Sequence, residues 1–297
     1  MTVAFFPRTV KRMSSFWDAI NAGHARRGSG KQAEARVEFE RALSLAADDD
    51  ERAEALLQVG WSLCGEGNHL QAVPHFEKVP ALYACDSYKK SQGQVAAGNC
   101  LRHAQTHAEA KAAYEKVLTL PGASPWHKSE ALLGIGNVLV GEGRHKYKEA
   151  RAAFERVQKS DGAHLHHVSE ALSTVGNLYW WESSDRYWRE ARTAYEKVIA
   201  FPGGHPHNQS SAQMMIGHTC RVEGNYALAI EEFRKVLSME LGHPHHKSEA
   251  QLYIGITYFE LQNHERAREE LEKVPLIRMA YEDHVKTAQT YLGRIKP

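Results

Sequence analysis

The sequence predicts an all-α solenoid of about seven helix–turn–helix repeats, followed by a C-terminal capping helix. The first observation is a glycine that recurs in similar helical segments, at Gly23, Gly60, Gly98, Gly136, Gly176, Gly217 and Gly255. Subtracting neighbouring positions gives spacings of 37, 38, 38, 40, 41 and 38 residues. A nearly fixed period in this range is typical of stacked repeats, because each repeat buries its apolar face only against its neighbours.

The second observation is a trio of residues expected on the second helix of each repeat. Alanine is followed four positions later by an aromatic residue or leucine, and three positions after that by alanine or valine. The small residue allows two helices to approach closely, and the large side chain fills the space one turn later. The trios are Ala35/Phe39/Ala42, Ala72/Phe76/Val79, Ala110/Tyr114/Val117, Ala150/Phe154/Val157, Ala191/Tyr195/Val198, Ala229/Phe233/Val236 and Ala267/Leu271/Val274.

The third observation is helical spacing of apolar residues, clearest in the fourth repeat, where they recur three and four positions apart. Gly141 and Gly143 are expected to end this first helix, since glycine accepts the left-handed conformation that closes a helix. The fourth and fifth repeats carry short insertions between their helices, near 145–147 and 184–187. Residues 279–294 are expected to form a last helix that covers the final repeat.

This pattern resembles the tetratricopeptide repeat family, whose repeats share the small residue in the first helix and the trio on the second. The resemblance covers roughly residues 14–277 and implies a right-handed α-solenoid that serves as a binding scaffold. The period here is longer than the family's usual ~34 residues. The expected segments are a disordered or leader segment at 1–13, repeats at about 14–48, 51–84, 87–123, 126–162, 166–204, 207–243 and 245–277, and a capping helix at 278–297.

Composition argues against several classes of partner. The 37 basic and 36 acidic residues are balanced, so no overall field favours nucleic acid or an anionic membrane. No apolar run approaches the ~20 residues that span a bilayer. The four cysteines show no close pairing in the sequence and are interpreted as reduced thiols. We therefore expect a cytoplasmic protein with neither nucleic acid nor membrane as a partner.

In the family that this pattern resembles, the first helices line a concave groove. The position after each glycine holds Asn99, Asn137 and Asn177 in three consecutive repeats. An asparagine amide both donates and accepts hydrogen bonds, so such a row can hold an extended peptide backbone of any sequence. The alternatives are that these amides are solvated or bond a neighbouring repeat. The family's lysine clamp for a C-terminal carboxylate has no counterpart here, because the corresponding positions hold Val95, Leu133, Ser173 and Met214.

Arginine and aromatic residues surround the asparagine positions and suit a ligand with carboxylates and apolar anchors. The glutamates Glu54, Glu130, Glu170 and Glu249 fall in the first turn of their helices. There the helix dipole favours negative charge, which makes a stabilising role the better interpretation than an acidic ligand-binding rim. The expected peptide-binding residues are Asn99, Asn137, Asn177, Trp61, Arg102, Trp180, His218 and Arg221.

Histidines cluster at the repeat junctions, but we predict no metal site and no cofactor. Zinc needs three or four ligands that converge on one point. Equivalent residues of adjacent repeats are expected one helix spacing apart, about 8–10 Å, which is too far to share an ion. The clusters are His127, His164/His166/His167, His205/His207 and His243/His245/His246.

The sequence favours a binding protein over an enzyme, because it contains no phosphate-binding glycine loop, no HExxH motif and no GxSxG motif. The predicted function is a protein–protein interaction scaffold that binds an extended peptide segment of a partner in the concave groove. Two alternatives remain open. One is an enzyme or small-molecule-binding protein with a pocket in that groove, and the other is a structural scaffold that self-associates as a homo-oligomer.

Overall fold

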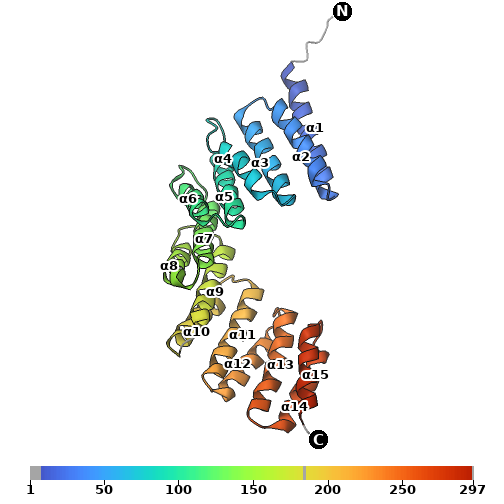
Figure 1. The fold of residues 1–297 in the computed structure, drawn as a ribbon, viewed down its shortest axis with the longest axis vertical. Coiled ribbons are helices and arrows are strands. Elements are labelled where there is room, and N and C mark those ends of the chain that lie inside the picture. Colours follow the sequence, from blue (N-terminus) through green and yellow to red (C-terminus); the bar gives the residue numbers. More distant parts are fainter. Residues whose placement is uncertain (1–7, 183–184, 296–297) are drawn as a thin grey trace, which may run out of the picture. The chain divides into compact units, whose positions relative to one another are not determined.

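The computed structural model of the chain describes residues 8–182 and 185–295 (Figure 1). Fifteen α-helices, two 3-10 helices and no strand occur in these two ranges, so the all-α prediction is confirmed. The helices fall into two compact units, Met1–His164 and Leu165–Pro297. No helix in the described ranges combines the length and apolar character that crossing a membrane requires.

The first unit is a stack of helical pairs in which each helix packs against the one before it. The first helices of successive repeats also touch directly, since α3 contacts α5 and α5 contacts α7. This consecutive packing is the arrangement of a solenoid. The elements are α1 (Arg8–Gly28), α2 (Gln32–Leu45), α3 (Asp49–Gly65), α4 (His69–Lys78), α5 (Ser87–His103), α6 (His107–Thr119), α7 (Pro125–Gly141), η1 (Arg144–Lys146) and α8 (Tyr147–Gln158).

The second unit repeats the same arrangement, with α9 contacting α11 and α11 contacting α13. Its last helix, α15, packs against both helices of the final pair. The elements are α9 (Leu165–Glu182), α10 (Asp185–Ala200), α11 (Pro206–Val222), α12 (Tyr226–Ser238), α13 (Pro244–Glu260), α14 (His264–Glu272), η2 (Val274–Leu276) and α15 (Glu282–Arg294).

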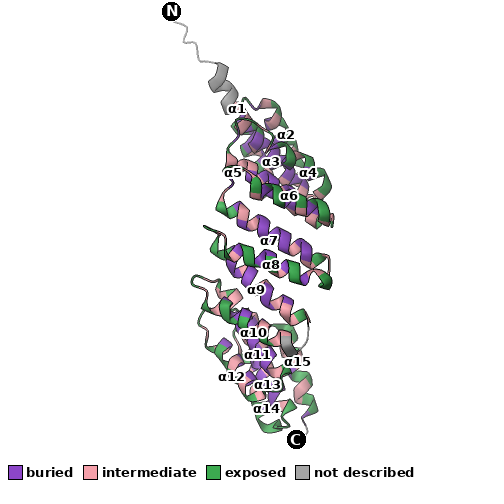
Figure 2. Ribbon diagram, turned by 90° about the vertical axis from the view of Figure 1, so that its left-hand side faces the viewer, coloured by how far each residue is buried: buried purple, intermediate pink, exposed green. Residues whose placement is uncertain are grey.

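The core is formed by the predicted trios, and all of their residues are at most 1% exposed. Figure 2 shows buried and exposed residues alternating along second helices such as α8, whereas the first helix α7 is mostly buried or intermediate. Each repeat glycine lies against the large residue of its trio. A Cβ atom added to Gly136 would lie 2.5 Å from the Phe154 ring, and one added to Gly217 would lie 2.4 Å from Phe233. Glycine is therefore required at this position because the ring occupies the space of a side chain.

The ends of several elements refine the sequence predictions. Helix α7 ends at Gly141, and Gly143, with φ of 110°, leads into η1 at the predicted insertion. Helix α1 begins at Arg8, inside the predicted leader or disordered segment, of which residues 1–7 lie outside the described residues. Residues 183–184 of the second insertion also lie outside them.

The last helix begins later than the spacing predicts. It starts at Glu282 instead of residue 279, because Met279 has φ of 60° and cannot continue a helix. Of its apolar residues, Ala288 is buried with 1% exposure.

Candidate functional site

Asn99 is half-buried on α5 and is held by two neighbours. The Tyr114 hydroxyl donates to Asn99 Oδ1 at 2.6 Å, and Asn99 Nδ2 donates to Glu130 Oε1 at 3.3 Å. Burial raises the pKa of Tyr114 to about 12, against the opposing effect of the nearby Arg102 guanidinium. The tyrosine therefore stays a neutral donor at physiological pH. Because an amide has two N–H donors and two acceptor directions, Asn99 keeps one of each for another partner.

Asn177 on α9 repeats half of this arrangement. The Tyr195 hydroxyl donates to Asn177 Oδ1 at 2.8 Å, and burial raises the pKa of Tyr195. Asn137 differs, because its repeat carries Phe154 in place of tyrosine. Within the described residues, the Asn137 amide makes no side-chain hydrogen bond, although it is equally half-buried on α7. The structure thus gives the three asparagines the same position and three different sets of partners.

Trp61 lies near Asn99, whereas Arg102 occupies a different environment. Trp61 and Asn99 both line a cavity of about 200 Å³, where the Trp61 ring is tilted against Phe76 at 6.3 Å between centroids. Arg102 does not line this cavity, and its Nε atom is buried without a hydrogen-bond partner among the described residues.

His218 is the most buried of the predicted binding residues, with 9% exposure. Its ring meets Tyr253 edge to face at 4.4 Å between centroids, and the Trp180 ring lies 6.4 Å away. His218 Nε2 lies 3.7 Å from Glu249 Oε1. Burial acts to raise the pKa of Glu249, but hydrogen bonding and charge from His218 outweigh it and lower that pKa. The structure therefore brings Trp180 and His218 together.

Arg221 is engaged by the next repeat. Its Nη1 atom donates to Glu260 Oε1 at 2.7 Å, and its guanidinium lies 5.4 Å from the Tyr253 ring. The side chain therefore links α11 to α13, and only its remaining N–H groups are available to a ligand.

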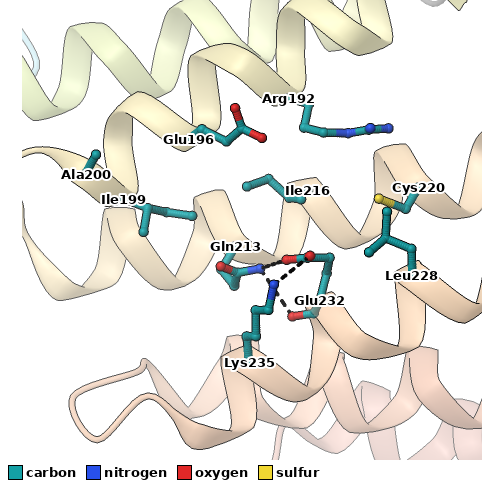
Figure 3. Close-up of a pocket in the computed structure, with 10 residues that line it drawn as sticks. All are labelled: Arg192, Glu196, Ile199, Ala200, Gln213, Ile216, Cys220, Leu228, Glu232 and Lys235. Atoms are coloured by element: carbon teal, nitrogen blue, oxygen red, sulfur yellow. Dashed lines mark hydrogen bonds and ion pairs between the residues drawn. The ribbon is translucent and has the colours of Figure 1, made fainter.

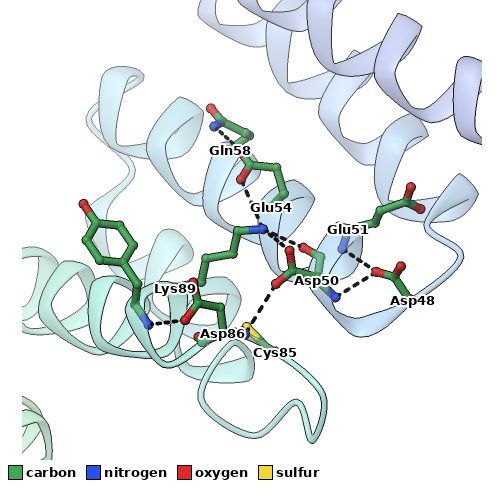
Figure 4. Close-up of polar contacts among 9 residues, drawn as sticks. Asp48, Asp50, Glu51, Glu54, Gln58, Cys85, Asp86 and Lys89 are labelled. Atoms are coloured by element: carbon green, nitrogen blue, oxygen red, sulfur yellow. Dashed lines mark hydrogen bonds and ion pairs between the residues drawn. The ribbon is translucent and has the colours of Figure 1, made fainter. Parts of the chain in front are cut away.

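The acidic residues at the start of α3 stabilise the repeat junction. Asp48 accepts from the backbone N–H of Asp50 at 2.9 Å and of Glu51 at 2.8 Å, which caps the helix (Figure 4). Lys89 on α5 donates to Asp50 Oδ2 at 2.6 Å and lies 3.9 Å from Glu54. The prediction that Glu54, Glu130 and Glu249 lie in the first turn of their helices was wrong, because α3, α7 and α13 begin about five residues earlier. These glutamates contact an adjacent repeat instead, so the helix dipole does not explain their position.

Sequence reasoning missed a hydrogen bond, buried or partly buried, that recurs between repeats in the second unit. The serine lies seven positions before the repeat glycine. It bonds a side chain of the following repeat or capping helix, at the position nine residues before the corresponding glycine there. We call these contacts the junction Ser–His pairs, and the name includes the one case in which asparagine replaces the histidine. They are Ser210 Oγ to His246 Nδ1 at 2.8 Å, Ser248 Oγ to His284 Nδ1 at 2.8 Å, and Asn208 Nδ2 to Ser169 Oγ at 3.0 Å. The recurrence of serine at this position was visible in the sequence and could have revealed them.

Two groups of side chains place potential metal ligands within 4.8 Å of one another. One is Cys64, His69 and Cys100, and the other is His207, His243 and His246. The expected separation of about 8–10 Å concerned equivalent residues of adjacent repeats, whereas each group combines residues at different positions within their repeats. That spacing describes helix axes, whereas these side chains extend toward each other across the gap.

The first of these groups also has unusual electrostatics. Cys64 Sγ lies 3.0 Å from Cys100 Sγ. These two cysteines are therefore close in the fold although they are far apart in the sequence. Hydrogen bonding with Cys100 and His69 lowers the pKa of Cys64 to about 6, although burial opposes this shift. Hydrogen bonding with Cys64 and burial raise the pKa of Cys100. The Cys64 thiol therefore loses its proton first.

A larger cavity of about 400 Å³ lies among α10, α11 and α12. Figure 3 shows Gln213 and Lys235 both bonded to Glu232 along its wall. Gln213 Nε2 lies 2.6 Å from Glu232 Oε2, and Lys235 Nζ lies 2.8 Å from Glu232 Oε1. None of the predicted binding residues lines this cavity. We therefore give this cavity no functional assignment.

Consecutive helical pairs with a glycine against a buried ring define an α-helical repeat protein of the scaffold type. Residues 210–243 and 249–275 match the tetratricopeptide repeat family. The resemblance seen in the sequence is confirmed, since these two segments of the chain match tetratricopeptide repeats. No curated protein matches it by sequence.

Solved structures agree with this fold. The C-terminal part of a TPR repeat-containing protein from Cytophaga hutchinsonii is 12% identical, with a TM-score of 0.63 over 90% of this chain and 98% of the other. A tetratricopeptide repeat protein from Parabacteroides merdae is 13% identical, with a TM-score of 0.52 over 93% and 98%. PilF from Pseudomonas aeruginosa is 16% identical, with a TM-score of 0.52 over 85% and 99%. At these identities the similarity concerns the fold alone.

Proposed function

We propose that this protein is an interaction scaffold whose first helices bind an extended peptide segment of a partner. The observation that supports this most directly is the fixed orientation of two asparagine amides. Tyr114 and Tyr195 hold the Oδ1 atoms of Asn99 and Asn177, so each amide presents its remaining hydrogen-bonding groups in one direction. A binding group that is already oriented loses less entropy when a ligand arrives.

The repeat geometry suits a backbone ligand. Adjacent packed helices lie about 8–10 Å apart, and an extended peptide advances about 3.3 Å per residue. One asparagine per repeat therefore meets the peptide backbone roughly every third residue. In the first unit Asn99 and Asn137 supply these contacts, with Trp61 as an apolar anchor and Arg102 as a carboxylate partner.

The second unit offers a corresponding set. Asn177 supplies the amide, while Trp180 and His218 form an aromatic surface with ring centroids 6.4 Å apart. Arg221 contributes through the N–H groups that do not bond Glu260. Aromatic and arginine residues are the commonest energetic anchors of interfaces.

The test is selection of peptides from a display library with the full chain, followed by affinity measurements on the selected peptides. Asn137→Ala removes an amide that bonds nothing else in the described structure, so it reports on the ligand with little effect on the fold. We expect a loss of about 0.5–1.5 kcal/mol of binding free energy. Asn21→Ala, at an exposed position on α1, is the matched control and keeps wild-type affinity.

Two further measurements sharpen the result. Methylating the backbone nitrogens of a selected peptide should abolish binding, since the proposal assigns recognition to its backbone. Equal affinity of wild type and an Asn99/Asn137/Asn177→Ala variant would contradict the proposal. A failure to select any peptide would instead favour the small-molecule or enzyme alternative, and self-association would appear in the molar mass of the purified protein in solution.

A further inference from the structure

The first unit contains a compact group of soft metal ligands. Cys64 lies near the end of α3, His69 is the first residue of α4, and Cys100 lies on α5. The ligand atoms of all three lie within 4.8 Å of one another, and the two sulfur atoms are 3.0 Å apart. Both cysteines are free thiols. The group is formed by two consecutive repeats, so it exists only in the folded stack.

The group borders the cavity of about 200 Å³ that also contains Trp61 and Asn99. Liquid water occupies about 30 Å³ per molecule, so this space accommodates an ion together with a water molecule. The side chains are half-buried at Cys64 and His69 and buried at Cys100. The cavity therefore gives solvent access to one side of the group.

The imidazole ring of His69 is held in place, and one of its ring nitrogens has no hydrogen-bond partner among the described residues. Its ring stacks on His103 with centroids 5.0 Å apart and planes at 16°. Its Nδ1 atom is buried and makes no hydrogen bond with any residue that the structure describes. Leaving a buried polar atom without a partner is costly, and coordination of an ion by Nδ1 would remove that cost.

We propose that Cys64, Cys100 and His69 bind one Zn²⁺ ion, with the fourth coordination position facing the cavity. Two thiolates and one imidazole form a known zinc ligand set in which the remaining position is left to water. Each thiol releases its proton to solvent when it coordinates the ion. With Zn–S distances of about 2.3 Å in a tetrahedron, the sulfur atoms sit about 3.8 Å apart, so binding separates them by somewhat less than 1 Å.

The histidine group at His207, His243 and His246 is the weaker candidate. It contains no thiolate, and two of its three side chains are exposed and solvated. It must still be separated from the cysteine site in any binding experiment. His207→Asn and His243→Asn together remove it without touching the first unit.

The test is titration of the full, reduced chain with Co²⁺ under inert gas, followed by displacement with Zn²⁺. We expect one Co²⁺ per chain with thiolate-to-cobalt charge-transfer absorption, and complete loss of that absorption after Zn²⁺ is added. Cys64→Ser and Cys100→Ser should each remove one thiolate and its share of the band. His69→Gln should weaken Co²⁺ binding at least tenfold.

Two matched controls should retain the full band. Cys220→Ser removes a buried thiol of the second unit, and the His207→Asn/His243→Asn variant removes the imidazole group. Zn²⁺ should also raise the Tm of wild type and of both controls, but not of Cys64→Ser.

Several outcomes would overturn the proposal. One is the absence of a thiolate band at one equivalent of Co²⁺, and another is a full band in Cys64→Ser. A third is a chain that forms a Cys64–Cys100 disulfide and binds no metal once that disulfide has been reduced. If a serine variant does not fold, the wild-type band intensity still decides, because it reports whether two thiolates, one or none bind the ion.

Discussion

At the scale of single residues, the contact between the repeat glycine and the large buried side chain explains why glycine recurs at the same position of every repeat. In the fourth repeat, Gly136 lies directly against Phe154, whose ring is fully buried. The ring is packed by both helices of the pair and has no room to move aside. The identity of the glycine is therefore set by packing, whereas its neighbour Asn137 remains available for function.

This contact gives a direct test. Gly136→Ala would place a Cβ atom 2.5 Å from the Phe154 ring, so we expect a loss of about 1–3 kcal/mol of unfolding free energy. The control is Gly28→Ala in the same unit, where nothing lies within 4 Å of the added atom. That variant should be neutral or slightly stabilised, because alanine favours the helix. Equal destabilisation of both variants in urea denaturation would contradict the packing argument.

The hydrogen bond from Tyr114 to Asn99 makes stability depend on alkaline pH. Burial raises the folded-state pKa from 10.0 to about 12. The unfolded chain ionises first, so the stability contributed by this group is complete below pH 10 and is lost as pH rises toward 12. Tyr114→Phe should cost about 0.5–1.5 kcal/mol at neutral pH.

The variant should also remove this pH dependence. The stability difference between wild type and Tyr114→Phe should shrink between about pH 10 and pH 12, as measured by denaturant unfolding. A constant difference across that range would show that the hydroxyl does not ionise with a raised pKa.

At the scale of helices, the junction Ser–His pairs fix the register between successive repeats. Ser248 bonds His284 Nδ1 at 2.8 Å and also accepts from the backbone N–H of Tyr281 at 3.3 Å. Ser210 makes the same two contacts with His246 and the N–H of His243. One hydroxyl thus connects both the loop and the helix of the following element.

Ser248→Ala should loosen the last helix. It leaves the Tyr281 N–H and His284 without this partner, which costs about 1–3 kcal/mol. Hydrogen exchange should accelerate in α15, while α9 stays protected. Ser238→Ala, at an exposed serine that bonds only a carbonyl of its own helix, serves as the control and should change stability by less than about 0.5 kcal/mol. Unchanged exchange in α15 would argue against this role of Ser248.

His127, at the start of α7, makes stability depend on acidic pH. It is 3% exposed, and burial lowers its pKa below the ordinary 6.5. The unfolded chain therefore takes up a proton that the folded chain resists. Stability from this group is complete above pH 6.5 and is lost as pH falls through the lowered pKa.

The test uses an asparagine that the chain itself places at this position, since Asn208 is the equivalent residue in the sixth repeat. His127→Asn should lose less stability than wild type between about pH 7.5 and pH 5. Exposed His145→Asn should retain the wild-type response. The prediction fails if His127→Asn and wild type show the same acid dependence.

At the scale of the whole chain, most contacts are between consecutive helices within each unit. The stability of such a stack is close to a sum of repeat and nearest-neighbour contributions, so damage at one end stays local. Ala288 in α15 is buried with 1% exposure, and Ala288→Glu would place a charge in its contact with α13 and α14.

We therefore expect Ala288→Glu to abolish hydrogen-exchange protection in α15 without changing it in α3 or α5. Gln289→Glu, at the exposed neighbouring position, should leave both regions unchanged. Loss of protection throughout the chain would show long-range cooperativity instead of nearest-neighbour behaviour.

The sequence predicted the repeats well because their glycines and trios are periodic and local. It predicted the start of the last helix less well, since the left-handed conformation of Met279 has no sequence pattern. It failed for Cys64 and Cys100, which differ in position within their repeats and meet only because of the offset between neighbouring helices. The partners of Asn99 also needed the structure, and the binding role of the asparagines stays a prediction.

The junction Ser–His pairs have a consequence for how the array changes length. If the seventh repeat were duplicated in tandem, His246 of the copy would meet Ser248 of the original. If the sixth were duplicated, Asn208 of the copy would meet Ser210 of the original. Both combinations already occur as residue types in this chain. A copy of the third repeat would instead bring Lys89, which suits the acidic start of α3 and not a serine. Gene duplication can therefore lengthen the second unit by whole repeats, whereas inserting the third repeat there would break a junction.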